Sequence, residues 1–351
     1  MTTRAKRNII ITSAVLLVVF FVFLIPNLVF IGLGSQKQVG SAKGYDWSSE
    51  DAFDINKHVT KTIEIGSDDF KILCIADIQR RNGGTAVKFL GTNLILDWIS
   101  EPKLRKMIKN TKPDLIVTVG DNMATKTTND IELKHIADFL DSFNTPWTTI
   151  FGNHDGEGRA DKARLCEILM ESEYGIFEYG PNDLHGVGNF IINLTRNSEI
   201  VYSIYMMDSG EHISTGGYDG INERQVEWYK WATNGINQYA KKEVKNIAFF
   251  HIPLPEYNDI LESDYIAGSK GETIASQEIN GGFFDAFKEN NGTHIFVGHD
   301  HANNFYANHE GVILGYVQKS SINGSFDSKK LGGTMLQIDN DNTIDISIIN
   351  Y

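Results

Sequence analysis

Cysteine is almost absent from this chain, and its scarcity excludes several classes of protein. Only Cys74 and Cys166 occur among 351 residues, so the sequence has neither a disulfide framework nor the cysteine spacing of a zinc finger. Cys74 lies in a run typical of a buried strand and Cys166 in a helical pattern, and we predict two buried free thiols. Seven prolines beside 32 glycines favour a globular chain rich in strands and turns.

Positive charge is also scarce. The net charge is −13, and no basic cluster occurs beyond the first seven residues. A nucleic-acid partner needs lysines and arginines to displace the counterions of the phosphate backbone, so we expect none here. The sequence contains no internal repeat and no low-complexity tract.

Long apolar runs are absent with one exception, Ile9 to Leu33, which follows three basic residues. A helix of this length reaches about 37 Å, enough to cross about 30 Å of hydrocarbon. We therefore predict a cytoplasmic N-terminus (1–8), a transmembrane signal anchor (9–33) and a polar stalk (34–58). The catalytic domain then lies outside the cytoplasm on a single-pass protein of the cell membrane, with the lipid bilayer as a partner. The alternative is a signal peptide cleaved near Gly32 to Ser35.

From residue 59 onward, short apolar runs alternate with helical patterns, which predicts one α/β domain over 59–351. We expect the first two strands, Lys61 to Ile65 and Lys71 to Ala76, to meet through a turn. A loop-rich insertion, Arg80 to Trp98, should precede a helix that begins near Pro102. Further helices are expected at 131–143, 160–171, 222–238 and 283–289, and strands at 115–119, 147–151, 190–194, 200–206, 247–250 and 293–297. The last four strands, from Asn304 to Ile349, are expected to form a β-meander.

Five predicted strands end in residues that bind metal ions. The strand over 293–297 is followed by Gly298-His299-Asp300-His301, where two histidines at positions i and i+2 can converge beyond the glycine. The other four strand ends carry Asp77-Ile78-Gln79, Gly120-Asp121-Asn122, Gly152-Asn153-His154-Asp155 and His251. Polar ends on five separate strands are hard to explain as core chemistry, so the pattern predicts a shared metal site.

In order and spacing, these motifs resemble those of the calcineurin-like metallophosphoesterases over roughly residues 70 to 310. The stretches Phe249 to Tyr257, Gly281 to Phe284 and Gly298 to Phe305 are more similar to the purple-acid-phosphatase-related branch (Dcr2-like phosphatases). The resemblance implies an α/β (α+β) four-layer sandwich, in which two mixed β-sheets pack face to face between helices. It also implies two divalent metal ions at the carboxyl ends of the strands.

The resemblance also implies a role for each motif. Asp77 and His301 are expected to hold the first ion and Asp121 to bridge both. Asn153, His251 and His299 are expected to complete the second site. His154 is expected to be the general acid or a donor to the transition state, oriented by Asp121 or a neighbouring carboxylate. Two ions about 3.5 to 4 Å apart can hold a hydroxide nucleophile and stabilise the oxyanions of displacement at phosphorus. Asp155 and Asp300 are expected to support these ligands and not to bind the ions.

Two positions depart from the family pattern. Gln79 stands where the family usually has histidine, and its harder amide oxygen should bind the first ion more loosely. Among Mn, Fe and Zn, it favours Mn. A glutamine at this position also resembles the pattern of the manganese-dependent ADP-ribose/CDP-alcohol diphosphatases, which share the Ala-Asp-Ile-Gln sequence of residues 76–79. Ala124 stands where purple acid phosphatases have a tyrosine, so no tyrosinate-to-iron colour is expected.

The expected function is metal-dependent hydrolysis of a phosphate ester, with a small molecule or a phosphoprotein as substrate. The branch resemblance favours a phosphomonoesterase. The first alternative is a phosphodiesterase or nucleotide-diphosphate hydrolase, and the second is a surface binding protein that keeps the fold without turnover. The histidines outside the motifs are interpreted as surface residues, although His185 and His212 lie in glycine-rich loops that could border the site. These residues are His58, His135, His185, His212, His294 and His309.

Overall fold

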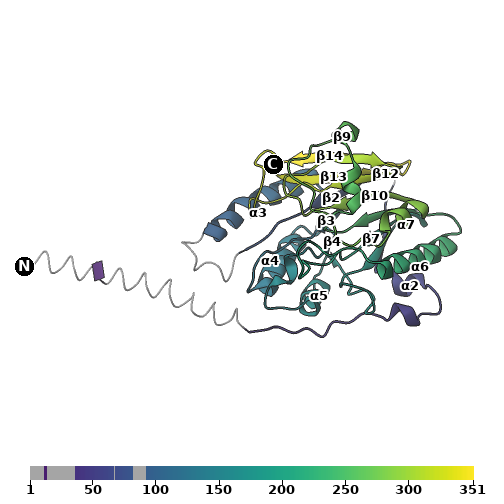
Figure 1. Cartoon of the computed structure of the whole chain (residues 1–351), viewed down its shortest axis with the longest axis horizontal. Helices are drawn as coiled ribbons and strands as arrows, with labels where there is room; N and C mark the ends of the chain where they lie inside the picture. Colours follow the sequence, from purple (N-terminus) through teal and green to yellow (C-terminus); the bar gives the residue numbers. More distant parts are fainter. Residues whose placement is uncertain (1–11, 14–35, 67, 82–91) are drawn as a thin grey trace, which may run out of the picture.

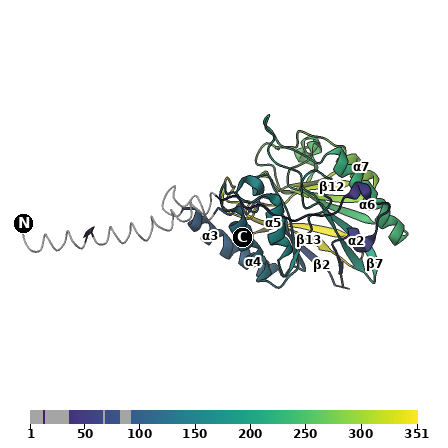
Figure 2. The same ribbon diagram turned by 90° about the horizontal axis from the view of Figure 1, so that it is seen from below.

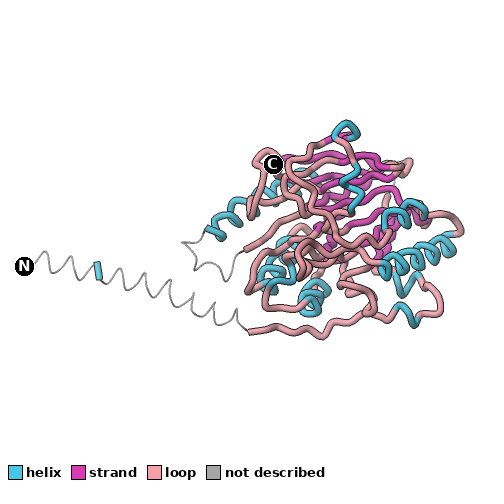
Figure 3. Tube along the Cα trace, viewed as in Figure 1, coloured by secondary structure: helices cyan, strands magenta, loops and turns pink. Residues whose placement is uncertain are grey.

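Two β-sheets form the centre of the molecule. The computed structural model describes residues 12–13, 36–66, 68–81 and 92–351. The strands of both sheets gather in the middle and the helices lie outside them (Figures 1 and 3). Buried apolar side chains from both sheets and the covering helices form one continuous core. This arrangement agrees with the predicted α/β sandwich.

The six-stranded sheet has the order β14-β13-β2-β3-β4-β5. Its strands are β2 (Phe70–Ile75), β3 (Leu115–Val119), β4 (Trp147–Ile150), β5 (Gly175–Ile176), β13 (Gly332–Ile338) and β14 (Ile344–Asn350). Strands β2 to β5 are parallel, while β13 and β14 are antiparallel to their neighbours. All five residues of β3 are buried, as expected for a β-branched run in the centre of a covered parallel sheet.

The eight-stranded sheet has the order β1-β6-β7-β8-β10-β12-β11-β9. Its strands are β1 (Lys61–Glu64), β6 (Phe190–Arg196), β7 (Glu199–Met206), β8 (Lys245–Phe249), β9 (Tyr265–Ala267), β10 (Gly292–Val297), β11 (Tyr306–His309) and β12 (Val312–Tyr316). Strands β7, β8, β10 and β12 run parallel. Their carboxyl ends therefore lie at a common edge of the sheet.

Helices cover both outer faces. Helices α3 (Thr92–Thr111), α4 (Asn129–Asp141) and α5 (Lys162–Met170) lie on one side of the strands, and α2 (Ile55–His58), α6 (Glu223–Ala240) and α7 (Phe283–Glu289) on the other (Figure 2). A capping box between Asn222 and Gln225 begins α6, and the Asp161 carboxylate caps α5. Short 3-10 turns complete the elements: η1 (Trp47–Ser49), η3 (Asp155–Glu157), η4 (Pro255–Asp259) and η5 (Glu262–Asp264).

Two strand pairings predicted from adjacency in the sequence are wrong. Strand β1 pairs in parallel with β6 of the eight-stranded sheet, whereas β2 belongs to the other sheet. The last four strands do not form one meander, because β11 and β12 pair together while β13 pairs with β2. In both places the chain crosses between sheets, since each sheet needs strands from both ends of the sequence to complete its buried face.

Helix α3 also differs from the prediction. It includes residues from Thr92 onward, so part of the expected loop-rich insertion is helical and Pro102 lies inside the helix. Proline removes a helical hydrogen bond, but Pro102 is exposed, and water can reach the carbonyl that loses its donor. Residues 82–91 of the same insertion lie outside the described residues.

The segment predicted as a stalk packs against the domain over residues 36–58, which we call the N-terminal strap. Gln38 forms a parallel bridge with Ala160, and the Trp47 amide donates to Asp183 at 2.8 Å. His58, expected at the surface, is 2% exposed. No helix in the described ranges is long and apolar enough to cross a membrane, and the predicted anchor at 9–33 lies outside them except for residues 12–13.

Candidate metal centre

The predicted ligands meet where the carboxyl ends of the two sheets come together. Strands β2, β3 and β4 of the six-stranded sheet lead into Asp77, Asp121 and Asn153, while β8 and β10 of the other sheet lead into His251 and the His299 motif. The carboxyl edge of parallel strands is the usual place for sites in α/β proteins. The site therefore depends on the packing of one sheet against the other.

The backbone is strained at four predicted site residues. Asp77, Gln79, Asp121 and His299 have φ angles of 53°, 46°, 49° and 76°. Left-handed conformations cost non-glycine residues about 1 to 3 kcal/mol and gather at functional sites. Asp77, Asp121 and His299 each lie two residues after the end of a strand, and Gln79 lies two residues after Asp77 in the same loop.

Two glycines allow the loops to approach each other closely. Gly120 has φ +74°, and a Cβ there would lie 2.5 Å from Nδ1 of His251. A Cβ at Gly152 would lie 2.3 Å from the backbone nitrogen of Asp121. Any side chain at these positions would push apart residues that the site brings together.

The first ligand group contains Asp77, Asp121 and His301. One ligand atom from each lies within 4.8 Å of the others, and Oδ1 of Asp77 is 3.4 Å from Nε2 of His301. Nδ1 of His301 lies 2.9 Å from the carbonyl oxygen of Ser325, which leaves Nε2 directed at the carboxylates. Two carboxylates and an imidazole at this spacing form a suitable set of ligands for a divalent cation.

Gln79 joins this group with its amide nitrogen inward. Nε2 donates to Oδ2 of Asp121 at 3.0 Å and lies 3.0 Å from Nε2 of His301, while Oε1 accepts from Arg81 at 3.4 Å. An amide binds a cation only through its oxygen. Gln79 can therefore act as a ligand only if its amide turns over.

The second ligand group contains Asn153, His251 and His299, again with Asp121. Nε2 of His251 is 3.4 Å from Oδ1 of Asp121, and its Nδ1 lies 2.9 Å from the carbonyl oxygen of Val119. The imidazole rings of His251 and His299 are 5.2 Å apart. The two oxygens of Asp121 thus face the two ligand groups, as a bridging carboxylate requires.

Unsatisfied buried atoms indicate that this centre suits cations. Oδ1 of Asp77, Oδ1 of Asn153 and Nε2 of His251 are buried without a hydrogen-bond partner. A buried polar atom without a partner costs about 1 to 3 kcal/mol. The oxygens of Asp77 and Asn153 are lone-pair donors. Against the effect of burial, Asp121 raises the pKa of His251 to about 10, so Nε2 of His251 becomes a lone-pair donor when a cation displaces its proton. The residues present therefore fit a divalent metal.

The buried charged groups around Asp121 shift the pKa values of their neighbours. Burial opposes ionisation of Asp121, but His251 holds the pKa of this carboxyl below its usual range, while burial lowers the pKa of His299 to about 3. His299 is therefore neutral, the form that binds metals. Lys319, which is 1% exposed, donates to the carbonyl oxygen of Asp77 at 2.8 Å, and burial lowers its pKa to about 8.

His154 lies at the margin of the centre and is partly exposed. Its backbone nitrogen donates to Oδ1 of Asp121 at 2.9 Å, and its Nδ1 lies 3.1 Å from Oε1 of Glu157. The carboxylate beside this imidazole is thus Glu157, three residues further along the chain, although Nδ1 makes no hydrogen bond to it. With Nδ1 facing Glu157, Nε2 is the nitrogen that can exchange a proton with a substrate.

Supporting residues brace the loops from behind. Asp155 accepts from the backbone of Gly152 and Met123, and burial with the neighbouring Asp121 raises the pKa of Asp155 to about 7. Asp300 accepts from the Tyr316 hydroxyl at 2.6 Å. Both carboxylates accept hydrogen bonds that hold neighbouring segments together.

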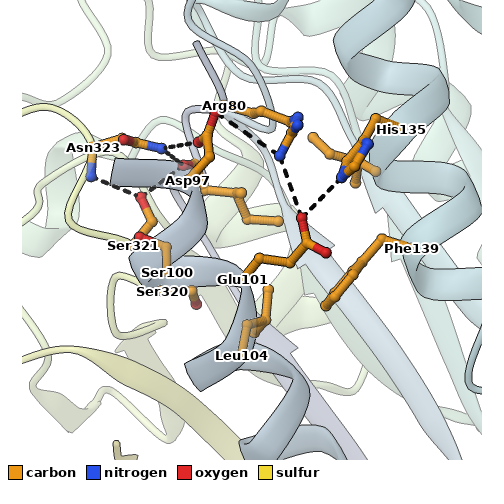
Figure 4. A pocket seen from close by; sticks show the side chains of 12 residues that line it. Arg80, Asp97, Ser100, Glu101, Leu104, His135, Phe139, Ser320, Ser321 and Asn323 are labelled. Atoms are coloured by element: carbon orange, nitrogen blue, oxygen red, sulfur yellow. Dashed lines mark hydrogen bonds and ion pairs between the residues drawn. The ribbon is translucent and has the colours of Figure 1, made fainter. Parts of the chain in front are cut away.

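Arg80 secures the chain just after Gln79. It donates to Glu132 of α4 at 2.8 Å and lies near Glu101 and Asp97 of α3, around a cavity of about 30 Å³ (Figure 4). The cavity has room for only one or two water molecules, so we interpret it as part of the scaffold. Helices α3 and α4 thereby fix the loop that carries Gln79.

Four residues near the centre were missed or set aside in the sequence: Glu157, Lys319, His212 and Tyr218. A signal was available for the last two, because their loop follows β7, a parallel neighbour of β8, and must begin at the same edge of the sheet. Glu157 lies three residues after His154, a spacing that brings side chains together in a helical turn. Lys319 lies on the crossing from one sheet to the other and had no local signal.

Comparisons with known proteins agree with the motifs. A family model described as calcineurin-like phosphoesterase matches residues 70–303. The chain is 26% identical over 247 residues to probable inactive purple acid phosphatase 14 of Arabidopsis thaliana, a match that covers 63% of this chain and 62% of that protein. It is 30% identical over 227 residues to phosphatase DCR2 of Saccharomyces cerevisiae, covering 59% of this chain and 39% of the yeast protein. The chain thus spans less than two thirds of either relative.

The chain therefore belongs to the calcineurin-like phosphoesterase family. The two relatives confirm the predicted purple-acid-phosphatase-related branch. Among solved structures, a dimetal phosphatase from Danio rerio aligns with a TM-score of 0.47 at 10% identity, over 76% of this chain and 95% of that chain.

Proposed function

We propose that this protein hydrolyses phosphate esters with two divalent metal ions, Mn²⁺ being favoured over Fe and Zn²⁺. One ion is held by Asp77, Asp121 and His301, to which Gln79 can add its oxygen by turning its amide over. The other is held by Asp121 with Asn153, His251 and His299. The observation that carries the proposal is the set of unpartnered buried ligand atoms on Asp77, Asn153 and His251, which come from both sheets.

The bound ions supply the activation of water and the charge neutralisation needed for displacement at phosphorus. The protein's own part is to place the reacting groups. Asp121 keeps its two oxygens directed at separate ligand groups, and His154 holds an imidazole at the partly exposed margin, where a leaving group departs. Glu157 lies beside Nδ1 of His154, so the other ring nitrogen delivers a proton to the leaving alkoxide. Such general acid catalysis contributes about 10² to 10⁴ in rate.

We propose a phosphomonoester as substrate, on a small molecule or a phosphoprotein. The branch supports this choice, because the yeast relative is named a phosphatase. A phosphodiester or nucleotide diphosphate is the alternative, and the Ala-Asp-Ile-Gln sequence of residues 76–79 favours it.

We further propose that residues 9–33 anchor the protein in the cell membrane, with the domain on the extracytoplasmic side. The support is the apolar run itself and the basic residues before it. The test places a cysteine near residue 36 of the full chain and asks from which side of the membrane it can be labelled. Labelling of a cysteine placed near residue 36 from the cytoplasmic side alone would contradict the orientation.

The activity is tested on residues 36–351, stripped of metal and reloaded with Mn²⁺, Fe²⁺ or Zn²⁺. The substrates are a monoester, a diester and a nucleotide diphosphate, and Asp121→Asn is the inactive control. We expect metal-dependent turnover of the monoester in the wild type and loss of turnover in the control. Preference for the diphosphate would establish the alternative substrate class. Full ion binding without turnover of any substrate would support a binding protein on this fold.

A further inference from the structure

A hairpin from the eight-stranded sheet reaches over the second ligand group. It lies between β7 and α6, spans residues 208–220, and is closed by an antiparallel bridge between His212 and Tyr218. Because β7 is parallel to β8, the hairpin begins at the edge of the sheet that carries His251. The proposed function assigns no role to it.

The base of the hairpin is firmly held. Asp208 is fully buried, accepts from Nζ of Lys162 at 2.8 Å and accepts from the Gly210 amide at 2.9 Å. On the other arm, the side chain of Asp219 pairs with His185. These contacts hold both arms of the hairpin beside the proposed ligands.

Two aromatic rings of the hairpin contact the proposed ligands. Nε2 of His212 lies 3.1 Å from Nδ2 of Asn153. The Tyr218 ring packs edge-on against His299 with centroids 4.2 Å apart, and it lies 4.8 Å from the His212 ring. Tyr218 thus braces His212 from one side and a ligand from the other.

The contact with Asn153 decides which end of its amide faces the centre. With Nδ2 hydrogen-bonded to His212, the oxygen Oδ1 is left buried and unpartnered. An amide nitrogen donates, so Nε2 of His212 must accept and the imidazole carries its proton on Nδ1. The opposite amide orientation would direct two N–H groups at a cation.

We propose that His212 is a positioning residue, which holds the Asn153 amide with its oxygen directed at the second ion. This inference rests on the proposed function, since it assigns a residue to the same site. By contrast, the oxygen of Gln79 in the other ligand group is turned away toward Arg81. One ion site therefore has its amide ligand oriented in advance and the other does not.

Calorimetric titration of the metal-free, full-length chain in detergent with Mn²⁺ tests the proposal. His212→Phe keeps a ring against Tyr218 but has no acceptor, whereas His212→Gln keeps an acceptor without the ring. We expect His212→Phe to bind one of two ions about 10- to 100-fold more weakly, the usual effect of losing a partner that orients a ligand. His212→Gln should restore most of the affinity. Thr215→Ala, an exposed change in the same hairpin, should leave both ions unchanged.

The results distinguish failure of the positioning role of His212 from failure of the proposed function. Unchanged affinity in His212→Phe, or equal weakening in the Phe and Gln variants, would overturn the positioning role and leave the proposed function standing. A wild type that binds two Mn²⁺ ions but hydrolyses no ester would overturn the proposed function alone. A wild type that binds fewer than two ions would overturn the two-ion centre and this inference with it. Thermal melting of each variant separates loss of a ligand partner from loss of the fold.

Discussion

At the scale of single residues, the two ligand groups differ in how many of their ligand atoms already face the centre. Asp121 faces both ligand groups, but the second group consists of ligand atoms already directed inward, whereas the first contains the inward amide nitrogen of Gln79. The family's usual histidine at this position would offer a ring nitrogen as a ligand. The first ion should therefore be the more easily lost.

Replacing Gln79 with histidine should tighten binding of the first ion. An imidazole provides a lone pair where the amide now directs its N–H groups, and we expect at least about a tenfold gain in affinity, equivalent to about 1.4 kcal/mol. Metal content after exposure to graded chelator concentrations measures the change. Lower or unchanged content in Gln79→His would contradict the idea that the amide of Gln79 weakens the first site.

Glu157 should matter for turnover and not for metal binding. Its carboxylate lies 3.1 Å from Nδ1 of His154, so Glu157→Gln loses the charge that would stabilise the imidazolium. We expect kcat to fall by about tenfold or more, but by no more than the 10² to 10⁴ attributed to a whole general acid, with KM and ion content unchanged. Glu171→Gln, an exposed change on the surface, is the matched control. Equal kcat values in the two variants would remove Glu157 from the mechanism.

At the scale of elements, loops after parallel strands carry the chemistry and helices hold those loops in place. Helix α5 does so through Lys162, whose Nζ pairs with Asp208 at the base of the hairpin. Asp208 is fully buried, so loss of its partner leaves an unpaired charge in the interior.

Lys162→Met should therefore destabilise the fold by about 3 to 5 kcal/mol. Lys242→Met is the control, because Lys242 forms an exposed ion pair with Glu199 and should change stability by less than about 1 kcal/mol. Urea denaturation of both variants measures the difference. Similar values for the two would mean that water reaches Asp208 and that the hairpin base is less rigid than we infer.

At the scale of the whole molecule, the N-terminal strap makes stability depend on pH. His58 lies within about 5 Å of the rings of Tyr45, Phe53 and Trp231, and Nδ1 accepts from the Asp54 amide. Burial lowers the pKa of His58 in the fold, although Glu50 partly opposes the effect. The unfolded chain therefore takes up a proton more readily than the folded protein.

The contribution of His58 to stability should be present above about pH 6.5, the ordinary histidine pKa, and decline as the pH falls below it. Urea denaturation of the wild type and His58→Gln at pH 7.5 and pH 5.5 measures this. We expect the advantage of the wild type to be smaller at pH 5.5. An advantage that grows on acidification would show that His58 is charged in the fold and paired with Glu50.

Local sequence patterns determined much of the site and most of the elements. The five strand ends, the two buried thiols and helix α7 at Phe283–Glu289 agree with the predictions. This succeeded because strand burial, turn chemistry and ligand type are properties of short segments. The same patterns could not place β1 and β2 in different sheets, since both pairings satisfy the same local periodicity.

Taken alone, the sequence predicted which residues could bind ions and determined in what order they follow their strands and that a long apolar run precedes the domain. Only the tertiary structure decided which way the amides of Gln79 and Asn153 face, that Glu157 lies beside His154, and that His212 reaches the centre. The physical reason is that an amide or imidazole takes its orientation from hydrogen-bond partners. Here those partners come from segments far apart in the chain, such as Asn153 and His212, and no local pattern encodes their meeting.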